Sequence, residues 1–509
     1  MDRLGRLAAL MALVLAVACG DRPAPDASAG ARSSSGAQGP RPLGDPAAPG
    51  QPPGAQPPGA PPPAAASGAA SPGEAELEAG WPLHGLVTGT QLVVRDAPDP
   101  EAGILGWLRV GSRLRARSGR VQTPTCSTGW VQIHPRGWAC AGQGITIEEA
   151  PPEAPFEVAP PDREAALPYA YYFVKEPMVP QYHRLPSREA QRESAAFAGR
   201  YLELLERDAG RAARLLEGEL GGDEPARPAI VARYLSRGFF LAGSGLESVE
   251  GRLFVRTVSG AYVQQARLEE RRGSELRGIE LDEAHPLPIP FAVRDAFPRM
   301  RRVREDGSVS WIRDREAGRI ERHGIVPGWL RRERVGDEIM HILEGDRYLH
   351  LHFVGLAERI EPPFRVGAEE SWVHVDLSEQ TLVLYRGPEP VYATLVSTGL
   401  EGHQTPTGVF HIRRKLISST MANLGPEAGD DRYRIEDVPW TQYFEGSIAL
   451  HAAFWHNRFG LPRSHGCVNL PPHAAHRVFE ATAPRIPAGW HGLSAEPARS
   501  EASRVVVTE

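Results

Sequence analysis

The sequence predicts a mainly β protein built from several domains. Short runs of alternating apolar and polar residues, separated by Gly, Pro and Asp turns, recur through most of the chain after residue 80, as in β-strands. One long stretch, near residues 187–216, has apolar residues at helical spacing instead. At 509 residues, the chain is long enough for two to four domains, each with its own core.

Residues 1–19 have the features of a secretory signal peptide. Arg3 and Arg6 precede an apolar run from Leu7 to Val17, and Ala16-Val17-Ala18 fits a cleavage site. The run is too short to cross a bilayer, which takes roughly 20 residues. Because a cysteine follows directly, the site also resembles a bacterial lipoprotein box, which implies lipidation of Cys19 and a membrane anchor. A soluble exported protein is the alternative.

Residues 20–80 are dominated by Pro, Ala, Gly and Ser, and contain the repeated unit Gln-Pro-Pro-Gly-Ala. Such a composition cannot build a packed core. We expect a disordered tether behind a membrane anchor, with a passive tail as the alternative.

Residues 81–150 alternate in short runs, for example 91–95 and 129–133, which predicts a small β-barrel. The Leu-Val-Val-Arg-Asp-Ala-Pro and Gly-Trp-Val runs resemble bacterial SH3-like domains. Cys126 and Cys140 lie in this segment, and in an exported protein we expect them to form a disulfide. Two buried thiols are the alternative.

Residues 162–363 predict a middle α+β region. It begins with a helix over 187–216 whose core stripe is Phe197, Tyr201, Leu204 and Leu205, and strands follow near 238–241, 253–257 and 260–263. We find no chemical constellation in this region. Its arginine clusters lie among acidic residues, which indicates solvated faces rather than a polyanion site.

Residues 371–490 predict another mainly β domain, followed by a tail over 491–509. The runs 372–377 and 381–385 alternate strongly, and Gly387-Pro388 marks a turn after the second. Three aromatic residues before His451, namely Trp440, Tyr443 and Phe444, can form a wall or lid of a binding site; core packing is the alternative.

The most informative residues are Ser464-His465-Gly466-Cys467-Val468-Asn469, preceded by His451. If this run is extended, His465, Cys467 and Asn469 share one face. Gly466 would let a substrate carbonyl approach the backbone N–H groups around Cys467, which can stabilise an oxyanion.

A cysteine attacks as a thiolate, and a nearby histidine promotes this state by pairing with the thiolate or taking its proton. Either histidine can serve on this argument alone. Purely structural roles are the common alternative for single cysteines and histidines. Zinc binding by His451, His456, His465 and Cys467 is a further alternative, but no Cys-x-x-Cys or His-Glu-x-x-His spacing supports it, so we expect no metal.

The stretch from His451 to Asn469 resembles the signature of L,D-transpeptidases of the YkuD family, and Thr405-Pro406-Thr407-Gly408 resembles the family's turn into a strand. The resemblance covers 371–490 and implies a mixed β-sandwich with a short helix at 473–482. It implies that Cys467 is the nucleophile and His451 the proton donor and acceptor, with His465 and Gly466 completing the catalytic loop. Asn469 stands where many members have Arg, and Ala452 where Gly is common, which bears on substrate preference.

The implied reaction starts with attack by Cys467 on the carbonyl between the third residue of a peptidoglycan stem and its terminal D-alanine. An amine of a neighbouring stem then attacks the thioester, giving a crosslink between third residues. The resemblance implies no cofactor and peptidoglycan stem peptides as partners, in a periplasmic setting. Ser464, Asn469, Trp440 and Tyr443 are the expected substrate contacts.

Three alternatives remain open at this stage: trimming of tetrapeptides by water attack, attachment or release of a wall-bound protein, and an inactive wall-binding structural protein. The net charge of −6, from 57 Lys plus Arg against 63 Asp plus Glu, offers no broad basic field for nucleic acid. No Walker loop, dinucleotide fingerprint or calcium loop is present. Nothing in the sequence indicates the oligomeric state.

Overall fold

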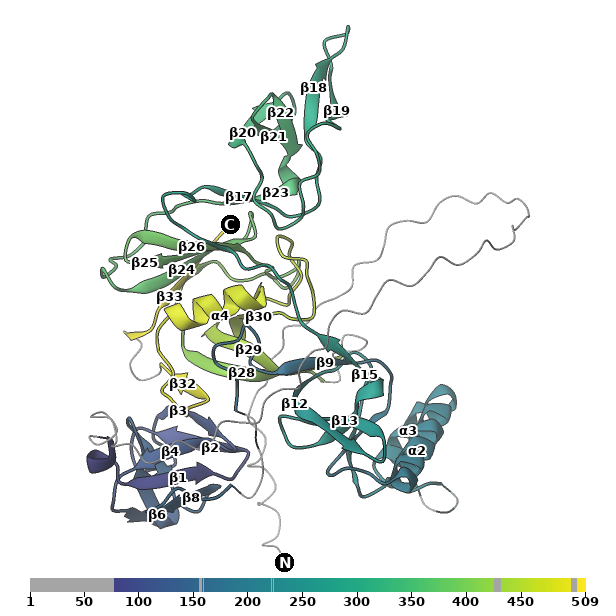
Figure 1. The fold of residues 1–509 in the computed structure, drawn as a ribbon, viewed down its shortest axis with the longest axis vertical. Coiled ribbons are helices and arrows are strands. Elements are labelled where there is room, and N and C mark those ends of the chain that lie inside the picture. Colours follow the sequence, from purple (N-terminus) through teal and green to yellow (C-terminus); the bar gives the residue numbers. More distant parts are fainter. Residues whose placement is uncertain are drawn as a thin grey trace, which may run out of the picture. The chain divides into compact units, whose positions relative to one another are not determined.

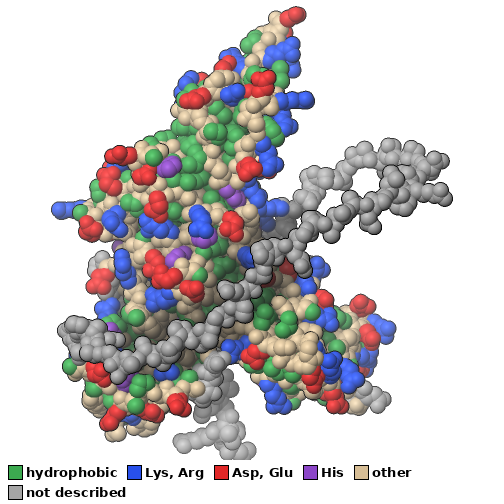
Figure 2. All heavy atoms as spheres, in the orientation of Figure 1, with side chains coloured by type: hydrophobic (Ala, Val, Ile, Leu, Met, Phe, Trp, Pro, Cys, Tyr) green, Lys and Arg blue, Asp and Glu red, His purple; other side chains and the backbone are tan. Residues whose placement is uncertain are grey.

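The structure is a computed structural model that describes residues 77–154, 158, 160–220, 222, 224–424, 432–495 and 501–509 (Figure 1). The predicted signal, Cys19 and nearly all of the predicted tether lie outside these residues. Strands predominate in the described part, which confirms the mainly β prediction. None of the described helices is both long and apolar enough to cross a bilayer. Acidic and basic side chains are interspersed over the face shown in Figure 2.

Residues 83–148 contain strands joined by turns and loops, with no helix. β1 pairs with β4 and β8, whereas β2, β3 and β5 to β7 belong to a larger network of strands. No sheet among the described residues closes on itself, and the SH3-like assignment of this region stays a prediction. Cys126 and Cys140 are joined by a disulfide, the pairing that the sequence predicted, with their Cα atoms 5.9 Å apart. The strands are β1 (Leu83–Val87), β2 (Gln91–Arg95), β3 (Ile104–Arg109), β4 (Arg113–Ala116), β5 (Val121–Thr123), β6 (Cys126–Gln132), β7 (Trp138–Cys140) and β8 (Ile145–Glu148).

The first part of the middle region contains the predicted helix, divided in two. Ser187 caps α2 and Asp208 caps α3, each by accepting a hydrogen bond from a backbone N–H. Phe197 and Leu204 are buried as predicted, but Leu205 is exposed. The elements are β9 (Ala170–Val174), β10 (Val179–Tyr182), α2 (Arg188–Arg207), α3 (Ala209–Leu216), β11 (Val231–Leu235), β12 (Phe240–Val249), β13 (Arg252–Thr257), β14 (Tyr262–Gln264), a 3-10 turn (Gln265–Arg267) and β15 (Leu268–Arg271).

The second part of the middle region packs on the C-terminal domain. β16 pairs with β26 of that domain, β17 pairs with β23, and the others form a five-stranded sheet in the order β19-β18-β22-β21-β20. The elements are β16 (Ile279–Glu280), β17 (Ile289–Ala292), β18 (Arg299–Val303), β19 (Val309–Arg313), β20 (Trp329–Val335), β21 (Glu338–Leu343), β22 (Arg347–His350), a 3-10 turn (Leu351–Phe353) and β23 (Val354–Ala357).

The C-terminal domain has the predicted mixed sheets and short helix. α4 begins at a proline, where the missing N–H costs nothing, and it packs against β29 and β30 (Figure 1). The elements are β24 (Ser371–Asp376), β25 (Thr381–Arg386), β26 (Glu389–Leu395), β27 (Gly408–His411), β28 (Arg414–Asn423), β29 (Tyr433–Glu445), β30 (Ile448–Ala452), β31 (Val468–Leu470), α4 (Pro472–Ala481), β32 (Gly492–Ser494) and β33 (Arg504–Thr508).

Part of the predicted tail belongs to this domain. β33 pairs in parallel with β24 and antiparallel with β27, and Val505 and Val507 are buried in the main core. The segment 491–509 is therefore not simply a tail. Its three consecutive valines fit a strand with both faces covered.

Candidate active site

Three neighbouring strands bring the predicted nucleophile and base together. β29 pairs with β30 so that Tyr443 lies opposite Ala449, and β30 pairs in parallel with β31 so that His451 lies opposite Asn469. Cys467 directly precedes β31. Because residues two apart on a strand share a face, Cys467 and Asn469 lie on the same side as Ala449 and His451.

His451 is oriented as a base. Its ring Nδ1 lies 3.2 Å from the carbonyl oxygen of Ala452, an acceptor, so Nδ1 carries the proton and donates. Its Nε2 is buried and has no hydrogen-bond partner among the described residues. Burial lowers the pKa of His451 to about 4, so the ring is neutral at neutral pH. The Nε2 lone pair is therefore available to accept a proton.

Cys467 is fully buried in an apolar cluster with Tyr171, Tyr443, Ala449 and Phe454. Its sulfur lies 3.9 Å from the carbonyl oxygen of Ser447.

Ser464 and Thr405 hold the loop around Cys467. The Ser464 hydroxyl accepts a hydrogen bond of 3.2 Å from the N–H of Gly466 and donates one of 2.5 Å to the carbonyl of Cys467. Thr405 donates to the carbonyl of Gly466 at 2.8 Å. The N–H of Gly466 is thus already engaged, and it is not a spare donor for an oxyanion. Ser464 is buried and shapes the loop, whereas the sequence suggested a substrate contact.

The catalytic run is not one extended strand, which corrects the predicted alternation. Gly466 has φ +112°, a conformation that favours glycine, and the chain bends at His465 and Gly466 before β31 begins. The ring of His465 lies against that of His403, with centroids 4.3 Å apart. The expectation that alternate residues share one face therefore holds for Cys467 and Asn469 but not for His465.

Asn469 is buried and tied to His456. The N–H of Arg458 donates to His456 Nδ1 at 3.2 Å, and burial lowers the pKa of His456 to about 3, so the neutral ring carries its proton on Nε2. Nε2 lies 3.1 Å from the side-chain amide of Asn469. An N–H at Nε2 needs an acceptor, so the amide oxygen of Asn469 faces the His456 ring. The NH₂ group then occupies the other amide position, which has no hydrogen-bond partner among the described residues. Asn469 thus offers a buried donor within the site.

Trp440 and Tyr443, the two aromatic residues predicted to contact substrate, lie in different surroundings. Trp440 is fully buried between β29 and α4, and its Nε1 donates to the carbonyl of Ala166. It is a core residue, so its predicted role in a lid is wrong. Tyr443 shares the apolar cluster of Cys467, and its hydroxyl lies 3.1 Å from that of Ser419. Tyr443 therefore remains a candidate wall of the site.

Sequence reasoning did not assign a role to Trp455, whose ring stacks with His451 at 5.7 Å, or to the link between His456 and Asn469. The place of Trp455 and His456 within the motif was the available signal. In the described part of the chain, no group of three or more His, Cys, Asp or Glu residues is arranged to hold a metal ion.

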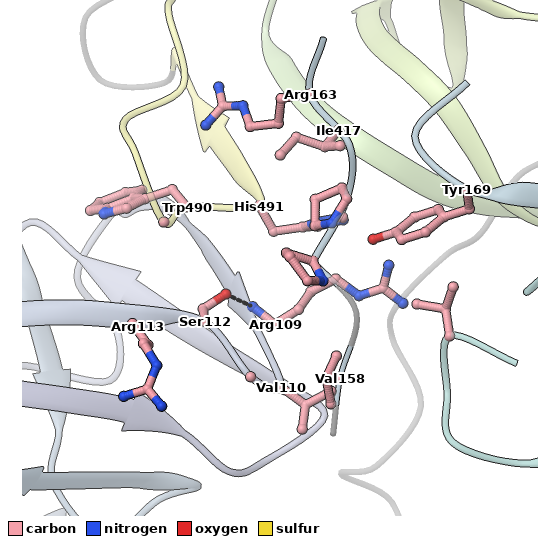
Figure 3. Close-up of a pocket in the computed structure, with 15 residues that line it drawn as sticks. Arg109, Val110, Ser112, Arg113, Val158, Arg163, Tyr169, Ile417, Trp490 and His491 are labelled. Carbon is pink, nitrogen blue, oxygen red and sulfur yellow. Dashed lines mark hydrogen bonds between the residues drawn. The ribbon is translucent and has the colours of Figure 1, made fainter. Parts of the chain in front are cut away.

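A separate cavity of about 390 Å³ lies where residues of β3, β28 and the segment before β32 meet (Figure 3). Arg109, Tyr169, Trp490 and His491 are among its lining residues. Neither Cys467 nor His451 lines it, so it is not the catalytic site.

Residues 370–495, about a quarter of the chain, match the sequence model of the L,D-transpeptidase catalytic domain, YkuD. No curated protein sequence matches the chain. An L,D-transpeptidase crystal structure from Enterococcus faecium shares 20% identity over 28% of this chain and 50% of that one, with a TM-score of 0.22. An L,D-transpeptidase from Mycobacterium smegmatis shares 18% over 42% of this chain and 77% of that one, with a TM-score of 0.23. An L,D-transpeptidase from Stackebrandtia nassauensis shares 22% identity over 29% of this chain and 59% of that one, with a TM-score of 0.20. The chain thus spans half of the Enterococcus structure, and we transfer no activity from these structures.

Proposed function

Because residues 370–495 form an L,D-transpeptidase catalytic domain of the YkuD family, we propose that this protein crosslinks the third residues of peptidoglycan stem peptides through a thioester on Cys467. The main support is the orientation of His451. Its Nδ1–H is held by the Ala452 carbonyl, and its buried Nε2, without a partner, lies on the face of the sheet that carries Cys467.

The proposed reaction requires Cys467 as a thiol. His451 Nε2 takes the thiol proton as sulfur attacks the carbonyl between the third stem residue and the terminal D-alanine. His451 then gives this proton to the departing D-alanine amine, and the C–N bond breaks to leave a thioester. The acceptor amine attacks the thioester, its proton passes through His451 to the leaving sulfur, and a new amide forms.

Asn469 is the donor that we propose for the developing oxyanion. With its amide oxygen facing His456, its NH₂ group takes the buried amide position that has no hydrogen-bond partner among the described residues, on the face that carries Cys467. A fixed donor in a dry site stabilises developing charge at little reorganisation cost. This matters because the Gly466 amide is already used by Ser464.

The test is incubation of the full chain, under a thiol reductant, with disaccharide-tetrapeptide, followed by mass spectrometry. Dimer formation with loss of D-alanine is the expected result, and Cys467→Ala must abolish it. Tripeptide alone would indicate trimming. Unchanged substrate across several stems and acceptors would sink the transpeptidase proposal and favour a wall-binding protein.

We also propose that the protein is exported to the periplasm and anchored by lipid on Cys19, on the basis of the N-terminal sequence. Radiolabelled palmitate should enter the parent chain in cells but not Cys19→Ala. Equal labelling of both would contradict the anchor.

A further inference from the structure

A second cleft borders the loop that connects His451 to Cys467. Its volume is about 720 Å³, within the usual range for ligand sites. One wall comes from the middle region, at residues 293–295 and 319–323, and the other from the catalytic loop, at Asn457, Arg458 and Leu461. A hollow of about 420 Å³ shares Glu321, Arg322, His323 and Asn457 with it and extends it along residues 274–279.

Close packing holds the two walls together. A Cβ at Gly460 would lie 2.4 Å from Val293 Cγ1, so only glycine permits this approach of the catalytic loop. Phe459 and Val293 share one buried cluster, and the Ser274 hydroxyl donates to Asn457 Oδ1 at 2.5 Å. The cleft is therefore a feature of packed structure, although the sequence indicated no chemical role for the middle region.

The cleft carries excess positive charge. Four arginines line it against two carboxylates. Both carboxylates are used within the wall: Asp295 and Glu321 pair with Arg319 at 3.7 and 3.4 Å, and Asp295 also accepts a hydrogen bond from the N–H of Arg322. The other three guanidinium groups form no ion pair with any described residue; they belong to Arg294, Arg322 and Arg458. This local excess contrasts with the net charge of −6 of the whole chain.

The backbone beside these arginines is strained. His323 has φ +71°, in the left-handed region that only a few per cent of non-glycine residues adopt. Its N–H donates to the carbonyl of Ala292 at 2.6 Å, and its ring packs near that of Phe459. Strain of this kind persists where the surroundings enforce it, often at binding sites. His323 directly follows Arg322, and both line the cleft.

A short chain of contacts connects the cleft to the catalytic pair. The N–H of Arg458 donates to His456, whose ring contacts the side chain of Asn469, and Asn469 lies opposite His451 in the sheet. Arg458 and Asn457 are exposed, whereas Cys467 and His451 are fully buried. The cleft is thus an outer site next to a buried inner one.

We propose that this cleft binds the carboxylate of the acceptor stem peptide, an inference that rests on the proposed function. The donor's terminal carboxylate lies one residue beyond the carbonyl that Cys467 attacks, so it must enter the buried inner site. A second stem brings its own carboxylate, and the planar guanidinium groups of Arg294, Arg322 and Arg458 suit bidentate binding of that group.

The test measures binding without catalysis, so that its failure is separate from failure of the proposed reaction. The probe is disaccharide-tripeptide, which lacks the terminal D-alanine and cannot act as donor. Calorimetry measures its binding to the full chain carrying Cys467→Ala. Two cleft variants are made in this background: one adds Arg294→Gln and Arg322→Gln together, and the other adds Arg458→Gln. Arg302→Gln, an exposed arginine on β18 outside the cleft, is the matched control.

We expect Kd to rise about tenfold or more in the cleft variants, as for loss of charge-assisted hydrogen bonds, and to stay unchanged in Arg302→Gln. The C-terminal amide of the probe should bind the Cys467→Ala chain as weakly as the acid binds the cleft variants. Equal binding of acid and amide would overturn the proposal even if a variant failed to fold. Binding of inorganic phosphate without binding of the tripeptide would overturn it too, in favour of a phosphate site.

Discussion

The hydroxyl of Thr405 donates a hydrogen bond of 2.8 Å to the carbonyl oxygen of Gly466, the residue before the proposed nucleophile. The same hydroxyl accepts a bond of 3.1 Å from the N–H of Gly399. Thr405 is 2% exposed, so water cannot readily replace these bonds. The position of the catalytic loop therefore depends on a side chain 61 residues earlier in the chain.

Thr405→Val should slow acylation of Cys467 by about 10- to 100-fold, because it removes both bonds while keeping the side-chain shape. Mass spectrometry of the reduced chain with a carbapenem, an acylating agent commonly accepted by this family, gives the rate. Thr407→Val, at an exposed position two residues on, is the control and should react like the parent. Equal rates for Thr405→Val and the parent would contradict the anchoring role.

His451→Gln should lower the rate of D-alanine release by about 100-fold or more, because it removes the general base. His473→Gln, on α4, should retain the parent rate. Full activity of His451→Gln would rule out His451 as the proton carrier and point back to His465.

The pH profile should reveal the buried base. With the pKa of His451 lowered to about 4 by burial, its Nε2 stays unprotonated well below pH 6.5. The acid limb of kcat/KM should therefore lie below 6.5, towards pH 4. A limb at or above 6.5 would mean that His451 is not the titrating base or is solvated in the reactive state.

Stability should fall in the same acid range. Burial lowers the pKa of His491 to about 3, with its Nε2–H donating to the Ser418 carbonyl. Between pH 6.5 and this value the unfolded chain binds more protons, so the free energy of unfolding decreases as pH falls, by up to about 1.4 kcal/mol per pH unit for one histidine. Urea unfolding of His491→Gln should show a shallower slope than the parent. Identical slopes would count against a buried neutral His491.

Lys415→Met should destabilise the C-terminal domain by about 2–4 kcal/mol. The buried Nζ of Lys415 donates to the carbonyls of Phe479 and Thr482, at 2.6 and 2.8 Å, and so satisfies the C-terminal end of α4. Urea unfolding measures the loss, and Lys175→Met, at an exposed lysine, is the control. A change below about 0.5 kcal/mol would show that water or neighbouring groups replace the lysine.

Much of the secondary structure followed from local pattern. The predicted strands at 372–377 and 381–385 correspond to β24 and β25, and the predicted helix at 473–482 to α4. The helix predicted over 187–216 is interrupted only at Asp208, which caps α3. These elements could be predicted because alternation, helical spacing and capping act over a few residues.

The failures have a common cause. Trp440 is core because α4 covers it. The bend at Gly466 removes His465 from the predicted face. The helix α4, which covers Trp440, and Thr405, which holds the Gly466 carbonyl, are distant in sequence from these residues, so local pattern could not reveal the contacts.

The sequence by itself determined the reactive groups: a cysteine, its histidines and the turn that contains Thr405, because chemistry depends on residue type and the motif keeps those types at defined spacing. Only the tertiary structure decided that His451 has a buried Nε2 with no hydrogen-bond partner among the described residues, how Asn469 is oriented, and that the middle region contributes arginines beside the loop before Cys467. Tautomer, burial and charge balance arise from atoms that chain folding brings together across tens to hundreds of residues.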